Sequence, residues 1–170
     1  MYRFVSIIIF FATLECFAGS TLAEPAVPRA ALRDAPRSIR IDGVALHLEA
    51  EVWRDFMPGW VVPSDTQAEE PDVPGKPMTV ELRVVAQNGL RIPQKLRVDV
   101  AWVMMRQRIW QSQPAEEKPR DPAAHEVAVT IRNGPKWPPQ ARVDIVVRIV
   151  DGNGATQLLA SRGQKIRAAT

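Results

Sequence analysis

Hydrophobic and polar residues alternate along most of the chain beyond position 38. The segment 44–53 shows this most clearly, because apolar residues occupy every second position and mostly polar residues lie between them. A period of two places alternate side chains on opposite faces of a strand, so the segment predicts a strand with one buried face. Similar patterns predict further strands over 39–41, 78–85, 96–104, 108–111, 126–132, 141–150 and 156–161. Whether the last strand continues over 165–167 is left open by the pattern.

Asparagine–glycine pairs separate several of these segments. Asn88, Asn133 and Asn153 are each followed by glycine, and such a pair tolerates positive φ at both central residues of a tight turn. We therefore expect a tight hairpin at Asp151–Gly154. Proline interrupts most stretches long enough to form a helix, and only residues 114–125 could contain a helical turn. About seven short strands with such turns predict an all-β, antiparallel sandwich.

The first 23 residues, Met1–Ala23, have the features of a secretory signal peptide. Arg3 precedes the apolar stretch Val5–Leu14, which is too short to span a bilayer. Thr21-Leu22-Ala23 then offers small residues at the −3 and −1 positions of a cleavage site. Retention of the segment as a membrane anchor is the alternative. The sequence thus predicts a periplasmic or secreted protein with no membrane span after cleavage.

A composition change after the signal segment marks the start of the mature chain. Residues 24–37 are rich in proline and alanine and predict a linker or a loosely tethered arm, so the folded domain is expected over 38–170. The single cysteine, Cys16, lies in the signal segment, which excludes an internal disulfide or a cysteine metal site in the mature part. A lipid-modified Cys16 is disfavoured, because Glu15 stands where a lipobox needs a small residue.

Composition and charge narrow the possible partners. The chain has 170 residues, of which 46% are hydrophobic and 24% charged, as in ordinary globular domains. Its formal net charge is only +3, and basic and acidic residues alternate along the chain. A nucleic-acid groove needs a concentrated basic face with aromatic stacking platforms, and no stretch offers one. We therefore expect no nucleic-acid partner.

The predicted strand pattern resembles the immunoglobulin-like or fibronectin-like sandwiches of exported bacterial proteins. The resemblance is carried by the strand count, by Trp102 on the expected buried face of its strand with Val98 and Val100, and by the final hairpin 143–159. It covers roughly residues 38–168. The cysteine pair and the tyrosine corner of true immunoglobulin domains are missing. Sandwiches of this kind mostly bind or space other molecules, so the resemblance implies a binding role.

Candidate catalytic and metal-binding residues are few. No serine of the mature chain lies in a nucleophile elbow or a Ser-x-x-Lys setting, and the only histidines are His47 and His125. His47 shares a strand face with Glu49 and Glu51, but residues two apart on a strand are separated by about 7 Å, which is long for binding one ion. We therefore expect no enzyme activity, no cofactor and no tightly bound metal, with His47 and His125 as weak metal candidates.

Two tryptophans in proline-rich loops are the candidate binding residues. Leaving the rings of Trp60 and Trp137 in water would cost on the order of 2–3 kcal/mol each. They therefore either plug one end of the sandwich or form a recognition surface, which Met57 and Lys136 would extend. In immunoglobulin-like connectivity both loops lie at the end opposite Asp151–Gly154. Pro58, Pro63, Pro135, Pro138 and Pro139 restrict φ in these loops.

These features together predict an exported, non-catalytic binding or accessory module. Its partner would be a protein or peptide of the cell envelope. Two alternatives stay open: a periplasmic protein that binds a small ligand, either a glycan or a metal, and a secreted enzyme inhibitor that presents the proline- and tryptophan-rich loops.

Overall fold

The computed structural model describes residues 27–57, 74–116, 121 and 123–169. The predicted signal peptide, its cleavage site and Trp60 lie outside these residues. The described elements are α1 Arg29–Asp34, β1 Ser38–Ile41, β2 Val44–Asp55, β3 Met78–Ala86, the 3-10 turn η1 Gln87–Gly89, β4 Arg97–Met105, β5 Arg108–Ser112, β6 Glu126–Gly134, β7 Arg142–Val150 and β8 Thr156–Ala169. The prediction of a mostly β protein is confirmed.

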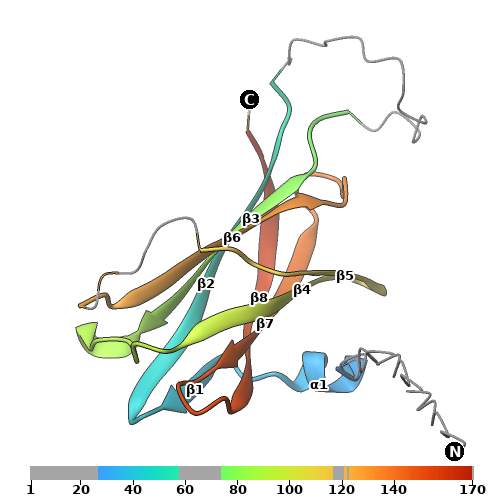
Figure 1. The fold of residues 1–170 in the computed structure, drawn as a ribbon. Coiled ribbons are helices and arrows are strands. Elements are labelled where there is room, and N and C mark those ends of the chain that lie inside the picture. The colour runs from blue at the N-terminus through green and yellow to red at the C-terminus, as the bar shows by residue number, and fades with distance from the viewer. Residues whose placement is uncertain (1–26, 58–73, 117–120, 122, 170) are drawn as a thin grey trace, which may run out of the picture.

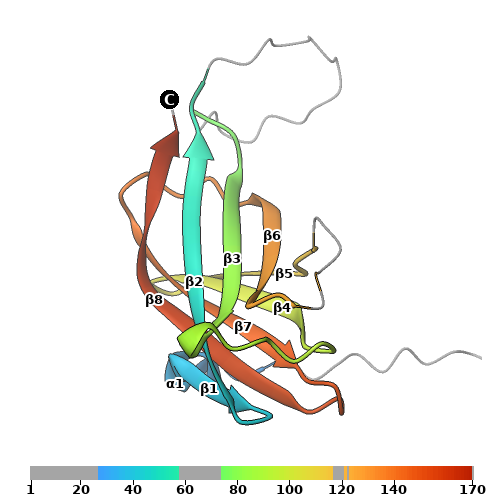
Figure 2. The ribbon, with the colours of Figure 1, turned by 90° about the vertical axis from the view of Figure 1, so that its left-hand side faces the viewer.

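The strands form one curled sheet in the order β5-β4-β7-β8-β2-β3-β6, and β1 pairs with β2 off this path (Figure 1). Neighbouring strands are antiparallel except at one place. Val52–Asp55 of β2 pairs in parallel with Ile166–Ala169 of β8, because both strands run toward the same end of the molecule (Figure 2). The prediction of a wholly antiparallel sheet is therefore wrong at this pair, and the sheet is mixed.

Strand β8 connects the two parts of the curled sheet. Its earlier residues pair with β7, and its last four residues pair with β2. Between these two parts the register shifts: Ser161 pairs with Ile145 but Gln164 pairs with Val143, so β8 has one residue more than β7. The additional residue makes a β-bulge, and Gly163 lies there with φ +70°. A bulge bends and twists its strand, which lets β8 belong to both parts.

Most apolar residues of the strands meet inside the curl, in what we call the interior cluster. The predicted alternation places them there, because every second residue of a strand faces the same side. Its members are Ile39, Ile41, Leu46, Leu48, Val52, Met78, Val80, Leu82, Val84, Ala86, Ile92, Leu96, Val98, Ala101, Val103, Val127, Val129, Ile131, Trp137, Val143, Ile145, Val147, Ile149, Leu159 and Ile166.

A second bulge places Trp102 on the other face of the sheet. The register of β4 against β7 shifts between Val98 and Val100, so Val98 faces the interior cluster whereas Val100 and Trp102 face outward. Asp99 at the shift accepts two hydrogen bonds from the Arg148 guanidinium, at 2.9 and 2.8 Å. The expectation that Val98, Val100 and Trp102 share one buried face is therefore wrong, although all three are buried.

Helix α1 covers this outward face and forms what we call the outer cluster. Its buried members are Leu32, Ala35, Val100, Trp102, Met104, Val146 and Ala160. Part of the segment 24–37, predicted as a linker or loosely tethered arm, is thus packed on the sheet. The physical reason is that β4 is apolar on both faces, so its outer face needs a cover. The N–H of Ala160 donates to the Pro36 carbonyl at 2.7 Å, which also ties the segment down.

Candidate functional site

The loops predicted to share one end converge where β2 ends, β3 begins and β6 passes to β7. We call this end the loop pole and define it by the described residues 54–57, 74–77 and 135–141. The β7–β8 hairpin at Asp151–Gly154 lies at the opposite end (Figure 1). Trp60 lies outside the described residues, so its predicted approach to Trp137 stays a prediction.

A single buried arginine organises the loop pole. Arg54 is 1% exposed, and its guanidinium donates from Nε to the Lys76 carbonyl at 3.1 Å, from Nη1 to the Trp137 carbonyl at 3.0 Å and from Nη2 to the Pro74 carbonyl. Its charge also lies 4.8 Å from the centre of the Phe56 ring. Burial lowers the pKa of Arg54, but a guanidinium stays charged at any ordinary pH. Arg54 therefore ties both loops to the sheet.

Sequence reasoning missed Arg54, although the pattern contains a signal for it. Position 54 continues the series of alternate positions 44 to 52, whose later members Leu46, Leu48 and Val52 are buried. A charged residue at the next buried position of a strand needs several hydrogen-bond partners. The loops on either side supply them as backbone carbonyls.

The four predicted binding residues do not form one surface. Trp137 is 5% exposed and belongs to the interior cluster, which is the position that the plug interpretation describes. Lys136 is half-buried, and Met57 is 54% exposed. Trp60 lies outside the described residues. Within the described part, the loop pole therefore presents a methionine and not a tryptophan to solvent.

An ion pair lies beside Arg54 on the surface of the loop pole. Lys76 Nζ donates to Asp55 Oδ2, and the Met57 N–H donates to Asp55 Oδ1 at 2.8 Å. The hydrogen bond from Lys76, followed by that from Met57, lowers the pKa of Asp55. The pair holds the end of β2 against the segment that leads into β3.

The weak metal candidates occupy separate places. His47 Nε2 lies 3.4 Å from Glu49 Oε1, but the other oxygen of Glu49 is paired with Arg83 at 2.9 Å. His125 Nδ1 lies 3.0 Å from the carbonyl oxygen of Leu90. Among the residues that the structure describes, no group of three or more histidine, cysteine, aspartate or glutamate side chains could hold a metal ion.

The strand predicted over 108–111, observed as β5, is the other candidate site. β5 is the first strand of the sheet order, and among the strands that the structure describes it pairs only with β4. Arg106 and Gln107 form the two-residue turn between them, with Met105 and Arg108 as the flanking pair. In such a hairpin the flanking pair is hydrogen-bonded and the next pair is not. The backbone N–H and C=O groups of Ile109 and Gln111 therefore point away from β4.

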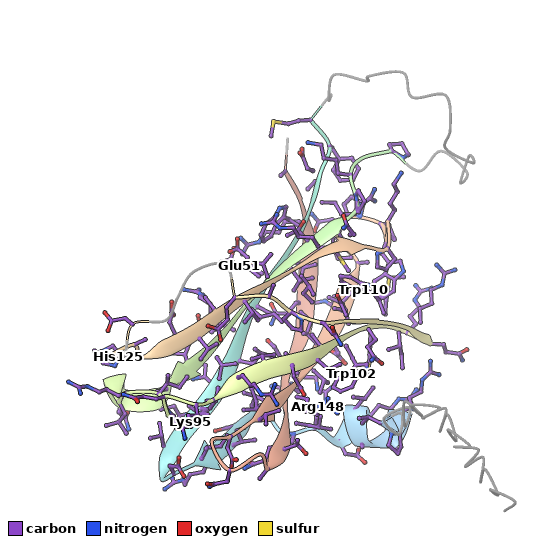
Figure 3. All side chains as sticks on the ribbon, viewed as in Figure 1. Glu51, Lys95, Trp102, Trp110, His125 and Arg148 are labelled. Atoms are coloured by element: carbon purple, nitrogen blue, oxygen red, sulfur yellow. The ribbon has the colours of Figure 1, made fainter. Side chains whose placement is uncertain are left out.

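The side chains of β5 hold this edge in place and leave part of it exposed. Trp110 is labelled in Figure 3. Its ring lies against Gly134, where a Cβ atom would approach within 2.7 Å of the ring. Gln111 accepts a hydrogen bond from Trp102 Nε1 at 3.0 Å. Ile109 is 37% exposed, and Arg106 and Arg108 are also exposed. The edge is therefore anchored on both faces of the sheet, and no strand of the described residues pairs with its outward backbone groups.

Comparisons with known proteins found no matching family model, no matching curated protein and no matching solved structure. Within the described ranges, no helix has the length and apolar character needed to cross a membrane.

Proposed function

We propose that this protein is an exported, non-catalytic binding module with an immunoglobulin-like sandwich, which binds an extended segment of an envelope protein along the edge of β5. The exported location rests on the signal features of Met1–Ala23. The observation that carries the binding role is the open edge of β5.

The strand order supports the immunoglobulin-like part of the proposal. The series β5-β4-β7-β8 has the order C′-C-F-G of such a fold, and β2-β3-β6 has the order A-B-E. The two series would be its two layers, with the interior cluster between them. The parallel contact of β2 with β8 then joins the layers at one side, and the bulge in β8 provides the bend.

An open strand edge can bind another chain by adding a strand to the sheet. Outward N–H and C=O groups provide backbone hydrogen bonds, and alternate side chains of the added strand provide specificity. Natural edge strands are often protected by inward charges, prolines or covering loops. Within β5 the exposed Ile109 and the absence of proline leave the edge suited to pairing.

The charges beside β5 indicate which partner segment fits. Arg106 and Arg108 are exposed at the turn end of the strand, and Arg29 of α1 donates to the Gln107 carbonyl at the same turn. No acidic residue lies between positions 100 and 115. An extended segment with alternating acidic and apolar side chains would therefore complement this edge better than a basic one.

A peptide titration tests the proposal. The probe is a capped heptapeptide, Thr-Glu-Val-Glu-Val-Glu-Thr, and a version with lysine in place of glutamate is its charge control. We expect the acidic peptide to shift the backbone amide signals of Ile109 and Gln111 and to slow their hydrogen exchange. The lysine version should bind at least fivefold more weakly.

Proline substitution separates edge pairing from general attraction. Ile109→Pro removes an outward N–H without removing a hydrogen bond to β4, so it should abolish binding of the acidic peptide, whereas Ile109→Thr keeps the N–H and should retain binding. Circular dichroism checks that both variants keep the strand content of the parent. Equal binding by both variants, or no binding by the parent, would refute edge pairing. If the parent forms a concentration-dependent dimer and Ile109→Pro is a monomer, the edge of β5 binds a second copy of this chain. That result would contradict the proposal of an envelope partner.

A further inference from the structure

We propose a second, separate site: a basic hollow at the junction of β2 and β8 that binds a phosphate or sulfate group carried by a small ligand. The hollow has a volume of about 320 Å³. The lining residues that matter for the argument are Glu51, Gln140, Arg142, Gln164, Lys165 and Arg167.

The hollow follows from the way β2 changes its neighbours. On one edge, β2 pairs with β1 as far as His47 and with β8 only from Val52 onward. Between these two residues this edge has neither neighbour. The bulge of β8 at Gly163 occurs beside the gap, and Gly163 also lines the hollow. The concavity is therefore a consequence of the strand topology and not of one flexible side chain.

The charges around the hollow are unbalanced. Among the residues that line the hollow, Arg142, Lys165 and Arg167 outnumber the one carboxylate, Glu51, whose Oε2 lies 3.5 Å from Arg167 Nη1. Lys165 has no hydrogen-bond or ion-pair partner among the residues that the structure describes. An excess of positive charge in a concave surface attracts anions.

Arg142 and Lys165 are direct cross-strand partners in the β7–β8 pairing. Like charges placed opposite one another destabilise a sheet, so this pair costs stability in the free protein. Arg142 Nη1 donates to the Gly163 carbonyl at 3.1 Å, which orients the guanidinium toward the bulge and leaves its other N–H groups for a ligand. An anion bound between Arg142 and Lys165 would attract both cations and so offset the repulsion between them.

The donor set indicates a tetrahedral oxyanion. A guanidinium can bind two oxygens of one phosphate or sulfate at once, and an ammonium group binds a third as a point charge. The Gln140 side chain adds an amide donor at the rim. The volume exceeds what one such ion needs and lies at the lower limit of ordinary ligand pockets, so a small organic group would occupy the rest.

This site is independent of the edge of β5. In the sheet order, β4 and β7 lie between β5 and β8, so failure of one proposal leaves the other standing. Binding at the hollow is tested by titrating the protein with inorganic phosphate at low ionic strength, with sodium chloride at matched ionic strength as the control. The readouts are calorimetry and the backbone amide signals of Gly163, Gln164 and Lys165.

The variant Lys165→Gln removes one charge from the hollow, and Lys95→Gln is the matched control. Lys95 packs near Gly152 of the β7–β8 hairpin, at the other end of the molecule. We expect phosphate to bind the parent and Lys95→Gln equally, and to bind Lys165→Gln at least fivefold more weakly. Equal effects of phosphate and chloride, or equal binding to both variants, would overturn the proposal, because each indicates general screening only.

Two further probes distinguish the sources of the oxyanion. Glycerol 3-phosphate represents a soluble phosphomonoester, and phosphatidylcholine vesicles with phosphatidylglycerol represent lipid headgroups. Stronger binding of either probe to the parent than to Lys165→Gln supports the site and identifies the source. Absence of binding by phosphate and by both probes overturns it.

Discussion

Two arginines fasten other segments of the chain to the sheet, and they do so in different surroundings. Arg54 at the loop pole donates from three different nitrogens to three carbonyls and is buried. Arg162 in β8 donates from a single nitrogen, Nη2, to the carbonyls of Leu32, Arg33 and Ala35, at 2.9, 2.8 and 3.1 Å. The first joins loops to the interior cluster, and the second joins α1 to the outer cluster.

The two arginines differ in how well the carbonyl groups that they bind could be hydrogen-bonded by water if the arginine side chain were removed. One Nη2 group has two hydrogens for three acceptors, so the bonds of Arg162 are shared and each is weak. Arg162 is also only half-buried, and its hydrogen bond to the Arg33 carbonyl is exposed to solvent. Arg54 itself is 1% exposed, its bond to the Trp137 carbonyl is buried, and its bonds to the Lys76 and Pro74 carbonyls are partly buried. We therefore expect the arginine at the loop pole to contribute more to the stability of the fold than the arginine under α1.

The largest effect is expected from Arg54→Met, which keeps the apolar stem and removes every donor. A buried carbonyl left without a partner costs about 1–3 kcal/mol, and Arg54→Met removes one buried and two partly buried hydrogen bonds, so we expect the free energy of unfolding to fall by about 2–5 kcal/mol. Urea unfolding measures it. Arg97→Met, at an exposed position of β4, is the matched control and should stay within about 0.5 kcal/mol of the parent. A similarly small change for Arg54→Met would show that Arg54 does not hold the loop pole.

A smaller and local effect is expected from Arg162→Gln. The loss should be about 1 kcal/mol, the usual net value of a hydrogen bond. Hydrogen exchange of the Leu32 amide, which donates to the Pro28 carbonyl at 3.3 Å, should accelerate while the amides of β2 and β3 keep their protection. A loss as large as that of Arg54→Met, spread over all strands, would contradict the contrast between the two regions.

The sequence predicts the interior cluster better than the outer cluster, and the reason is periodicity. Strands such as β2 and β3 alternate without interruption, so their buried faces can be assigned from the sequence. The strand predicted over 108–111 is likewise confirmed, as β5. Such strands can be predicted from the local alternation of apolar and polar residues and from the residue types in the turns.

The outer cluster depends on features that leave little trace in a periodic pattern. The bulge at Asp99 shifts the parity of β4 by one residue, so Trp102 changes face although the alternation continues unbroken in the sequence. Helix α1 has six residues, too few to show a helical period among prolines. The basic hollow likewise depends on the pairing of β2 with β8, residues more than 100 positions apart, which no local pattern encodes.

The smallest effect on stability is expected from the ion pair of Asp55 and Lys76 beside Arg54. It tests whether the exposed side of the loop pole contributes as much to the free energy of unfolding as the buried side. The pKa of Asp55 is lowered in the folded state, so the pair stabilises the fold at any pH above the ordinary aspartate pKa of about 3.9 and is lost as the pH falls through the folded value. Asp55→Asn removes the charge but can still accept the Met57 N–H. We therefore expect it to be slightly less stable than the parent at pH 7, and the difference to shrink below pH 4.

Urea unfolding at several pH values measures this difference, and Lys76→Gln serves as the partner variant. The double variant should be no less stable than either single variant, because each already breaks the same pair. A difference that persists unchanged at low pH would assign the effect to the turn at Met57 and not to the charge. Both single effects should stay well below that of Arg54→Met, because solvent screens the pair on the surface, whereas the guanidinium beside it is buried and bonds three carbonyls.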